Sequence, residues 1–348
     1  MEAISLSCKR WLGYGCIVLL VSSARTSAET IELPGIDSEV EIIVDKWGVP
    51  HIYAESESDL FFAQGFNAAR DRLWQMDLWR RQGLGRLASA LGPRYLPRDA
   101  ANRLFLYRGD MEKEWFSYGP DAKSIATAFT NGINAYIAHL ETMPQKLPPE
   151  FRLLNYRPER WAPEDVVRIR THGLWRNATS EILRAQIICQ HGLNAASLWK
   201  RLEPFKEPTI PKGFDPCSIP ENVLDVYRLA KAPISFRQYM EASTIESPDH
   251  LDSIGSNNWA VSPSRTRKGS AILANDPHRL HTVPSVRYAS HLIAPGINII
   301  GAGEPTLPGI SIGHNEDIAF GLTIFAIDQE DLYYYPLDAD NPYQYTHA

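Results

Sequence analysis

Apolar positions recur at helical spacing in two long stretches of the first half of the chain. Ser56, with Asp59 three residues later, suits the start of the first helix. Its apolar face is Phe62, Phe66, Ala69, Leu73 and Met76. The second stretch carries Ile125, Phe129, Ile133, Tyr136 and Leu140, and it should end before Pro144. The pattern predicts two long amphipathic helices that contribute to the core.

The polar face of the first helix carries a dense set of charges, namely Arg70, Asp71, Arg72, Asp77, Arg80 and Arg81. Such a face is usually solvated or tied up in ion pairs on the helix surface, so we do not assign an anion site to it. Shorter helices are predicted from Pro163 toward Trp175, and from Glu181 to about Gln190.

Alternating, strand-like patterns lie at both ends of the sequence. Residues 40–53 indicate two short strands around a turn at Lys46–Gly48. After Ser256, residues 259–262 and 271–274 predict a hairpin, and further strands are predicted at 288–293, 297–300 and 318–325. Helices followed by strands indicate an α+β fold.

The middle of the chain has the composition of a linker. Prolines cluster between Glu203 and Pro220, and polar residues dominate from Ser243 to Ser253. We therefore predict a connecting segment at 205–255.

Composition bounds the class of protein. A chain of 348 residues with 44% hydrophobic content can bury a large core. A net charge of -6 and the absence of a Lys/Arg tract exclude nucleic acid as a partner.

Residues 1–28 have the pattern of a secretion signal: Lys9 and Arg10, an apolar run from Trp11 to Val21, and small residues up to Ala28. That run is shorter than the ~20 residues of a membrane-spanning helix, so we expect export without stable membrane insertion. Cys189 and Cys217 would remain in the exported protein. One disulfide can form between them, but the sequence does not decide whether it does.

The bond between Gly255 and Ser256 is the candidate centre of chemistry. If it were cut, Ser256 would carry a hydroxyl and a free α-amine with a pKa of ~8, which is a nucleophile and a base on one residue. Gly-Ser pairs are common, and Gly269-Ser270 is a second one in this chain. The dipeptide alone is therefore weak evidence.

The motifs around this bond make a stronger signal. Downstream they are Gly255-Ser256-Asn257-Asn258-Trp259, Leu273-Ala274-Asn275-Asp276-Pro277-His278, Pro308-Gly309, Gly313-His314-Asn315, Ala319-Phe320-Gly321-Leu322-Thr323 and Asp328-Gln329-Glu330-Asp331-Leu332. Upstream they are Trp47-Gly48-Val49-Pro50-His51-Ile52, Arg70-Asp71-Arg72-Leu73-Trp74-Gln75-Met76-Asp77 and Thr179-Ser180-Glu181-Ile182. In this order they resemble the two chains of the penicillin acylase family of N-terminal nucleophile hydrolases.

The resemblance implies a four-layer αββα sandwich, with two antiparallel sheets between helices, that is incomplete in this chain. It also implies a periplasmic precursor that cuts itself before Ser256. The expected parts are a signal peptide at 1–28, a mainly helical α-chain at 29–204, a spacer at 205–255 that is removed on maturation, and the start of the catalytic β-chain at 256–348. The α- and β-chains would form a heterodimer that hydrolyses a linear amide in an N-acylated small molecule, such as a β-lactam antibiotic or an acyl homoserine lactone.

The resemblance also assigns roles to individual residues. Gly255 and Ser256 would be the self-cleavage site, and Ser256 the nucleophile of turnover. His278 would orient the serine, and the backbone N–H of Ile324 would stabilise the oxyanion. The acyl pocket would include Trp175, Thr323 and Phe325, each of which is otherwise an ordinary core or strand residue. A histidine at 278, where phenylacetyl-preferring penicillin acylases have glutamine, is closer to the cephalosporin, homoserine lactone and lipopeptide acylases.

The family's calcium site would fall on Glu181, Asp328, Glu330 and Asp331, since hard oxygen ligands suit Ca²⁺. Its role would be structural, and no organic cofactor is expected. The chain ends well short of the family's usual second chain, and no asparagine in it can be assigned as the oxyanion side chain. We expect a fragment or a truncated product that does not complete the active site.

Three other interpretations stay open. Gly309-Ile310-Ser311-Ile312-Gly313 fits the nucleophile elbow of α/β-hydrolases, with Ser311 as the serine of an esterase, although the following sequence does not favour a helix. A zinc site could be sought among His278, His281, His291 and His314, but their spacing is not that of a metal site. An inactive family member that binds small molecules after export would keep the fold and lose self-cleavage.

Overall fold

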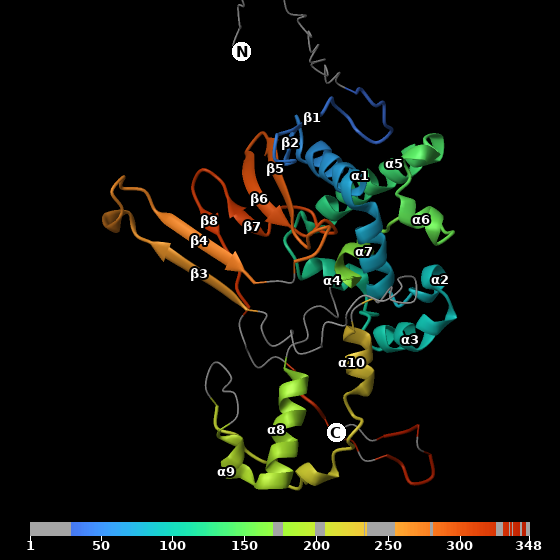
Figure 1. The fold of residues 1–348 in the computed structure, drawn as a ribbon, viewed down its shortest axis with the longest axis vertical. Coiled ribbons are helices and arrows are strands. Elements are labelled where there is room, and N and C mark those ends of the chain that lie inside the picture. The colour runs from blue at the N-terminus through green and yellow to red at the C-terminus, as the bar shows by residue number, and fades with distance from the viewer. Residues whose placement is uncertain are drawn as a thin grey trace, which may run out of the picture. The chain divides into compact units, whose positions relative to one another are not determined.

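The structure is a computed structural model that describes residues 29–169, 177–198, 206–232, 234, 255–278, 281–324 and 330–333, together with 335, 337–341 and 343–345. By its contacts the chain divides into a small unit, Met1–Pro34, and a large one, Gly35–Ala348. Every helix and strand described here belongs to the large unit (Figure 1). The signal predicted at 1–28 lies outside the described residues.

Two long helices carry the first half of the large unit. Helix α1 (Glu57–Gly83) begins where the pattern predicts, because Ser56 accepts a hydrogen bond from the Asp59 N–H at 3.0 Å. Helix α5 (Ala122–Thr142) matches the second predicted helix. The shorter helices are α2 (Ala88–Leu91), α3 (Leu96–Leu104), α4 (Met111–Phe116), α6 (Pro149–Leu153), α7 (Pro163–Arg168), α8 (Ala178–His191), α9 (Leu193–Ala196) and α10 (Asp225–Lys231).

Two of these short helices correct the predictions from the sequence. Helix α7 ends at Arg168 instead of continuing toward Trp175, which lies outside the described residues. Helix α10 stands inside the segment that the prolines led us to treat as a linker. The remaining short helical turns are η1 (Pro93–Tyr95), η2 (Pro144–Lys146), η4 (Pro216–Ser218) and η7 (Pro263–Arg265).

The strands form a mixed six-stranded sheet and a separate two-stranded ribbon (Figure 1). The sheet has the order β1-β2-β5-β6-β7-β8, and the ribbon pairs β3 with β4. Their bounds are β1 (Glu41–Val44), β2 (Pro50–Tyr53), β3 (Ser256–Val261), β4 (Ile272–Pro277), β5 (Tyr288–Ala294), β6 (Ile297–Gly303), β7 (Ile312–His314) and β8 (Ala319–Phe320). The predicted hairpins and strands are therefore present, although β8 is shorter than the predicted 318–325 strand.

The sheet joins the two ends of the sequence. Strand β2 pairs with β5 in parallel, with His51 opposite His291, whereas the other pairings are antiparallel. The fold is therefore a mixed α+β fold. The expectation of purely antiparallel sheets is wrong for the β2–β5 pair.

One hydrophobic cluster contains residues that precede the Gly255–Ser256 bond in the sequence and residues that follow it. Ile52, Leu60 and Phe61 from the first half pack in one cluster with Leu292 of β5. Ile52 and Leu292 are fully buried. The two halves of the sequence are therefore one folded body in this region.

Helices α1 and α5 cross at a distance that only glycine permits. A Cβ on Gly65 would overlap the carbonyl oxygen of Phe129, and a Cβ on Gly132 would overlap that of Phe62. Both obstructing atoms belong to the backbone, so no side chain can rotate away. The glycines set the packing of the two long helices.

The charged face of α1 is more buried than the sequence suggests. Arg80 donates to Asp165 on α7 at 2.8 Å, and Arg81 donates to Asp77 at 2.7 Å. These side chains are no more than 7% exposed. The prediction of ion pairs is confirmed, but the pairs at Arg80 and Arg81 lie inside the protein and not on a solvated surface.

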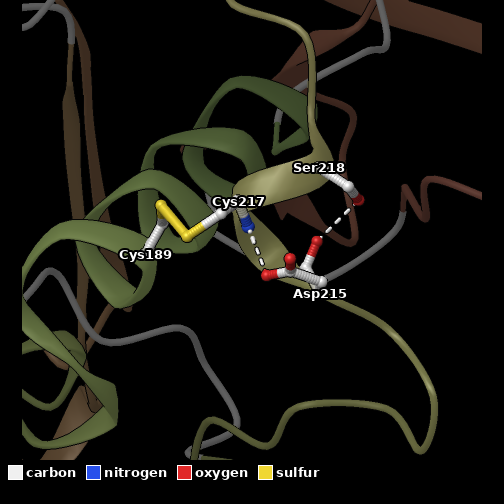
Figure 2. The surroundings of a disulfide bond; sticks show 4 residues. All are labelled: Cys189, Asp215, Cys217 and Ser218. Atoms are coloured by element: carbon white, nitrogen blue, oxygen red, sulfur yellow. Dashed lines mark hydrogen bonds between the residues drawn. A yellow bond between two sulfur atoms is a disulfide. The ribbon is translucent and has the colours of Figure 1, made fainter.

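Cys189 on α8 and Cys217 in η4 form a disulfide, which settles the pairing that the sequence left open (Figure 2). Within the described ranges, every helix is too short or too polar to span a lipid bilayer.

Candidate active site

The Gly255–Ser256 bond stands at the entrance to the β3–β4 ribbon. Ser256 is the first residue of β3, and its partner in register is Pro277 at the end of β4. The carbonyl oxygen of Gly255 accepts a hydrogen bond from the His278 backbone N–H at 3.1 Å and another from the Ser256 hydroxyl. Two donors therefore polarise the carbonyl of the bond in question.

The ring of His278 lies over the same bond. A Cβ built on Gly255 would stand 3.5 Å from the ring's Nδ1, an ordinary contact distance, so the imidazole lies directly beside this residue. The Nε2 of His278 is 3.0 Å from Oδ2 of Asp276, two residues earlier on β4. The structure thus places Gly255, Ser256 and His278 together. It also places the Asp276 carboxylate within hydrogen-bond distance of the Nε2 atom of the imidazole.

Asn275 on β4 holds the segment that follows β8 against the β3–β4 ribbon. Its amide Nδ2 donates to the Leu322 carbonyl at 3.0 Å, and its Oδ1 accepts from the Leu322 N–H at 3.3 Å. Leu322 is followed by Thr323 and Ile324, so the segment expected to supply the oxyanion N–H runs beside β4. Strand β3, which pairs with β4, begins with Ser256.

Sequence reasoning missed the part played by Asn275. Asn275 stands in the Leu273-to-His278 motif, directly after the apolar residues 271–274, but no spacing in the sequence points to its partner Leu322. The pocket residues Trp175 and Phe325 lie outside the described residues.

Two of the predicted calcium ligands, Glu181 and Glu330, lie at the N-terminal end of α8. Glu181 lies in the first turn of that helix. The Oε2 of Glu330 accepts the backbone N–H groups of Asn177 and Ala178, each at 2.7 Å. Glu330 therefore caps the helix, where its negative charge is favoured by the helix dipole.

The calcium site stays a prediction. In the described part of the chain, no three or more His, Cys, Asp or Glu side chains are grouped so as to hold a metal ion. Asp328 lies outside the described residues. The carboxylate of Glu330 is turned to the helix N-terminus.

Polar contacts tie α1 to the segment that follows Ser256. The Tyr288 hydroxyl donates to Oδ2 of Asp71 at 2.7 Å and accepts a hydrogen bond from Asn67. Burial, followed by the Asp71 charge, raises the pKa of Tyr288 well above its ordinary value. Gln64 makes a matched pair of hydrogen bonds with the backbone of Gly309, at 2.9 and 3.0 Å.

The competing interpretations find less support. Ser311 leads directly into strand β7, whereas a nucleophile elbow needs a helix after its serine. His291 pairs with His51 through their Nδ1 atoms at 2.9 Å, and the described residues contain no group of three or more His, Cys, Asp or Glu side chains that could hold a metal ion. The esterase and zinc interpretations are therefore not favoured.

Comparison with known proteins assigns the class. A model of the penicillin amidase family matches residues 39–348, and the chain belongs to this family. It is 32% identical over 318 residues to penicillin acylase 2 proenzyme of Pseudomonas sp. strain SE83, a match covering 87% of this chain and 38% of that protein.

Two other relatives cover similar ground. One is acyl-homoserine lactone acylase QuiP of Pseudomonas aeruginosa, at 29% identity over 86% of this chain and 35% of its own length. The other is penicillin G acylase of Escherichia coli, at 26% identity over 89% of this chain and 42% of its own length. The chain thus spans well under half of the length of these relatives.

Proposed function

We propose that the full-length protein is an exported acylase that hydrolyses the linear amide of an N-acylated small molecule. It would be matured by self-cleavage between Gly255 and Ser256. The observation that carries the proposal is the paired donation of Ser256 and His278 to the Gly255 carbonyl oxygen. Family membership and the penicillin and homoserine lactone acylases among the relatives support it.

Self-cleavage starts from the uncut peptide bond, where Ser256 has no free amine. The Ser256 Oγ attacks the Gly255 carbonyl carbon, and the oxyanion that forms stays within reach of the His278 backbone N–H. The C–N bond then breaks, and its nitrogen takes a proton to become the α-amine of Ser256. Water hydrolyses the resulting ester and leaves a carboxylate on Gly255.

Turnover uses the amine that self-cleavage releases. The neutral α-amine of Ser256 takes the proton of its own hydroxyl, and Oγ attacks the acyl carbonyl of the substrate. The amine product leaves with that proton, and water then releases the acyl group from Oγ. The imidazole of His278, steadied by Asp276 at 3.0 Å, would orient the α-amine.

The substrate class is an acyl amide of a small polar amine. Relatives named for penicillin and for acyl homoserine lactones both fit this description. We propose a pocket formed in part by Trp175, Thr323 and Phe325, with the Ile324 N–H on the oxyanion. We also propose a periplasmic α–β heterodimer, joined by the β2–β5 pairing and the contacts of Tyr288.

The test is a pair of serine variants in the full-length protein. Ser256→Ala should abolish both the cut and the hydrolysis of a panel of N-acyl homoserine lactones and penicillins. Ser270→Ala is the matched control, because it alters the second Gly-Ser pair of the same ribbon, and it should be cut and active. Intact mass and N-terminal sequencing report the cut, and product amine reports turnover.

The outcomes separate the alternatives. An active Ser256→Ala variant together with an inactive Ser311→Ala variant would favour the esterase. An uncut and inactive wild type that still binds these ligands would favour a binding protein.

A further inference from the structure

The disulfide joins two parts of the chain that maturation was expected to separate. Cys189 lies in α8, within the predicted α-chain, and Cys217 lies in η4, within the predicted spacer at 205–255. A bond between the two sulfur atoms keeps residue 217 attached whatever peptide bonds are cut between them.

The Cys217 half of the bridge is a fixed local structure. The side chain of Asp215 accepts the Cys217 N–H at 2.9 Å, and the Ser218 hydroxyl donates to the Asp215 carbonyl at 2.6 Å (Figure 2). This arrangement is a side-chain-capped helical turn and not an extended linker.

Helix α10 packs against the α-chain beyond the bridge. Leu224 is 3% exposed, Tyr227 9%, and Ala230 is fully buried. Leu224 and Tyr227 form one hydrophobic cluster with Ala178 and Ile182 of α8. The spacing of three between the buried residues gives α10 one face that is covered by the rest of the protein.

Further contacts with the α-chain are made by Tyr227, Ala232 and Ile234. The ring of Tyr227 meets Phe105 edge-on, with centroids 6.1 Å apart. The guanidinium of Arg98, a buried side chain of α3, donates to the carbonyl of Ala232. Ile234 packs against the separate cluster of Leu78, Leu87, Leu91 and Tyr95.

We propose that residues 206–232 stay on the mature protein, docked on α3 and α8 and linked through Cys189–Cys217. The segment lost on maturation would therefore lie C-terminal to Ala232, and the α-chain body would reach some 30 residues further than the composition suggests. This inference rests on the proposed self-cleavage.

The test uses full-length protein matured in an oxidising compartment, with thiols alkylated before any reduction. Peptide mapping under non-reducing conditions should recover a peptide that links Cys189 to Cys217, in a one-to-one ratio with the chain that begins at Ser256. Tyr227 and Ala232 should be recovered with the α-chain.

The double variant Cys189→Ser/Cys217→Ser distinguishes the bridge from the packing. It should keep residues 206–232 through gel filtration under native conditions, because the Tyr227 cluster remains. Loss of those residues from the native double variant would overturn the packing argument.

Two failures can be told apart. A mature protein that begins at Ser256 but lacks residues 206–232, with Cys189 alkylated as a free thiol, would overturn this inference and leave the proposed function standing. A protein with no chain beginning at Ser256 would sink the proposed function instead. In that case, amide hydrogen exchange of the uncut protein decides the inference: residues 225–231 should be protected if α10 is docked, and exchange as fast as in an unstructured peptide would overturn it.

Discussion

Replacing Tyr288 by phenylalanine should weaken the junction between α1 and the segment after Ser256. The change removes a hydroxyl that donates to a carboxylate at 2.7 Å, a bond of a kind that contributes ~1.5–3 kcal/mol. The Asp71 side chain is 35% exposed, so water can replace part of the lost bond, and Asn67 still donates to Asp71 at 3.3 Å. We therefore expect a loss near the low end, ~2 kcal/mol.

The effect is measured by urea unfolding of the uncut Ser256→Ala protein, which keeps the two parts on one chain. With an m-value of ~3 kcal/mol/M, the Tyr288→Phe midpoint should fall by roughly 0.7 M. Tyr343→Phe is the control, because that side chain is 93% exposed, and its midpoint should not move.

The dependence on pH gives a second, independent readout. Burial and then the Asp71 charge raise the pKa of Tyr288 above 10, so the unfolded hydroxyl ionises before the folded one. The stabilisation is therefore complete below pH 10 and declines as the pH rises above it. Equal midpoints for the parent and Tyr288→Phe proteins at neutral pH, or a difference that grows above pH 10, would refute the reasoning.

Three further outcomes follow from the packing. Gly132→Ala should lower the free energy of unfolding by ~1–3 kcal/mol, measured by thermal unfolding, because the added methyl overlaps the Phe62 backbone. Gly119→Ala is the control, since Gly119 has open space around it, and this change should not destabilise the protein. Unchanged stability of Gly132→Ala would contradict the close packing of α1 against α5. Asp165→Ala should lower the free energy of unfolding by ~3–5 kcal/mol, because it leaves the Arg80 charge buried without its partner. Glu112→Ala, in the exposed pair with Lys123, should lower it by less than ~1 kcal/mol. Similar losses for the two variants would argue against burial as the cause. Glu330→Gln should lower stability by ~1 kcal/mol equally with and without a calcium chelator if the residue acts as a helix cap, and a loss that the chelator abolishes would show calcium ligation instead.

Local patterns were enough to predict the two long helices and most of the strands, but they did not predict the contacts between segments that are far apart in the sequence. The apolar spacing of α5 and the alternation of β5 were readable because each of these elements buries one face. The burial of Arg80 depends on Asp165, and the parallel partner of β2 lies beyond the middle of the chain. Neither can be seen from a local window.

The candidate site shows the same division. The Gly255-Ser256 motif and His278 were identified from the sequence, and the structure brings them together at one carbonyl. The role of Asn275 required the position of Leu322, which no spacing gives. The prolines before α10 concealed it, because composition alone cannot distinguish a linker from a docked segment with three buried residues.

The core shared by Ile52, Phe61 and Leu292 has a consequence for the order of the folding reaction. Before the cut at Ser256, these side chains meet within one molecule, and the rate of folding does not depend on concentration. The cut that we propose at Ser256 would place them on two polypeptides, so a denatured mature protein would have to refold by a second-order encounter. Dilution would then slow recovery of the mature form but not of the uncut precursor, and the lifetime of the mature form would be governed by how slowly it opens.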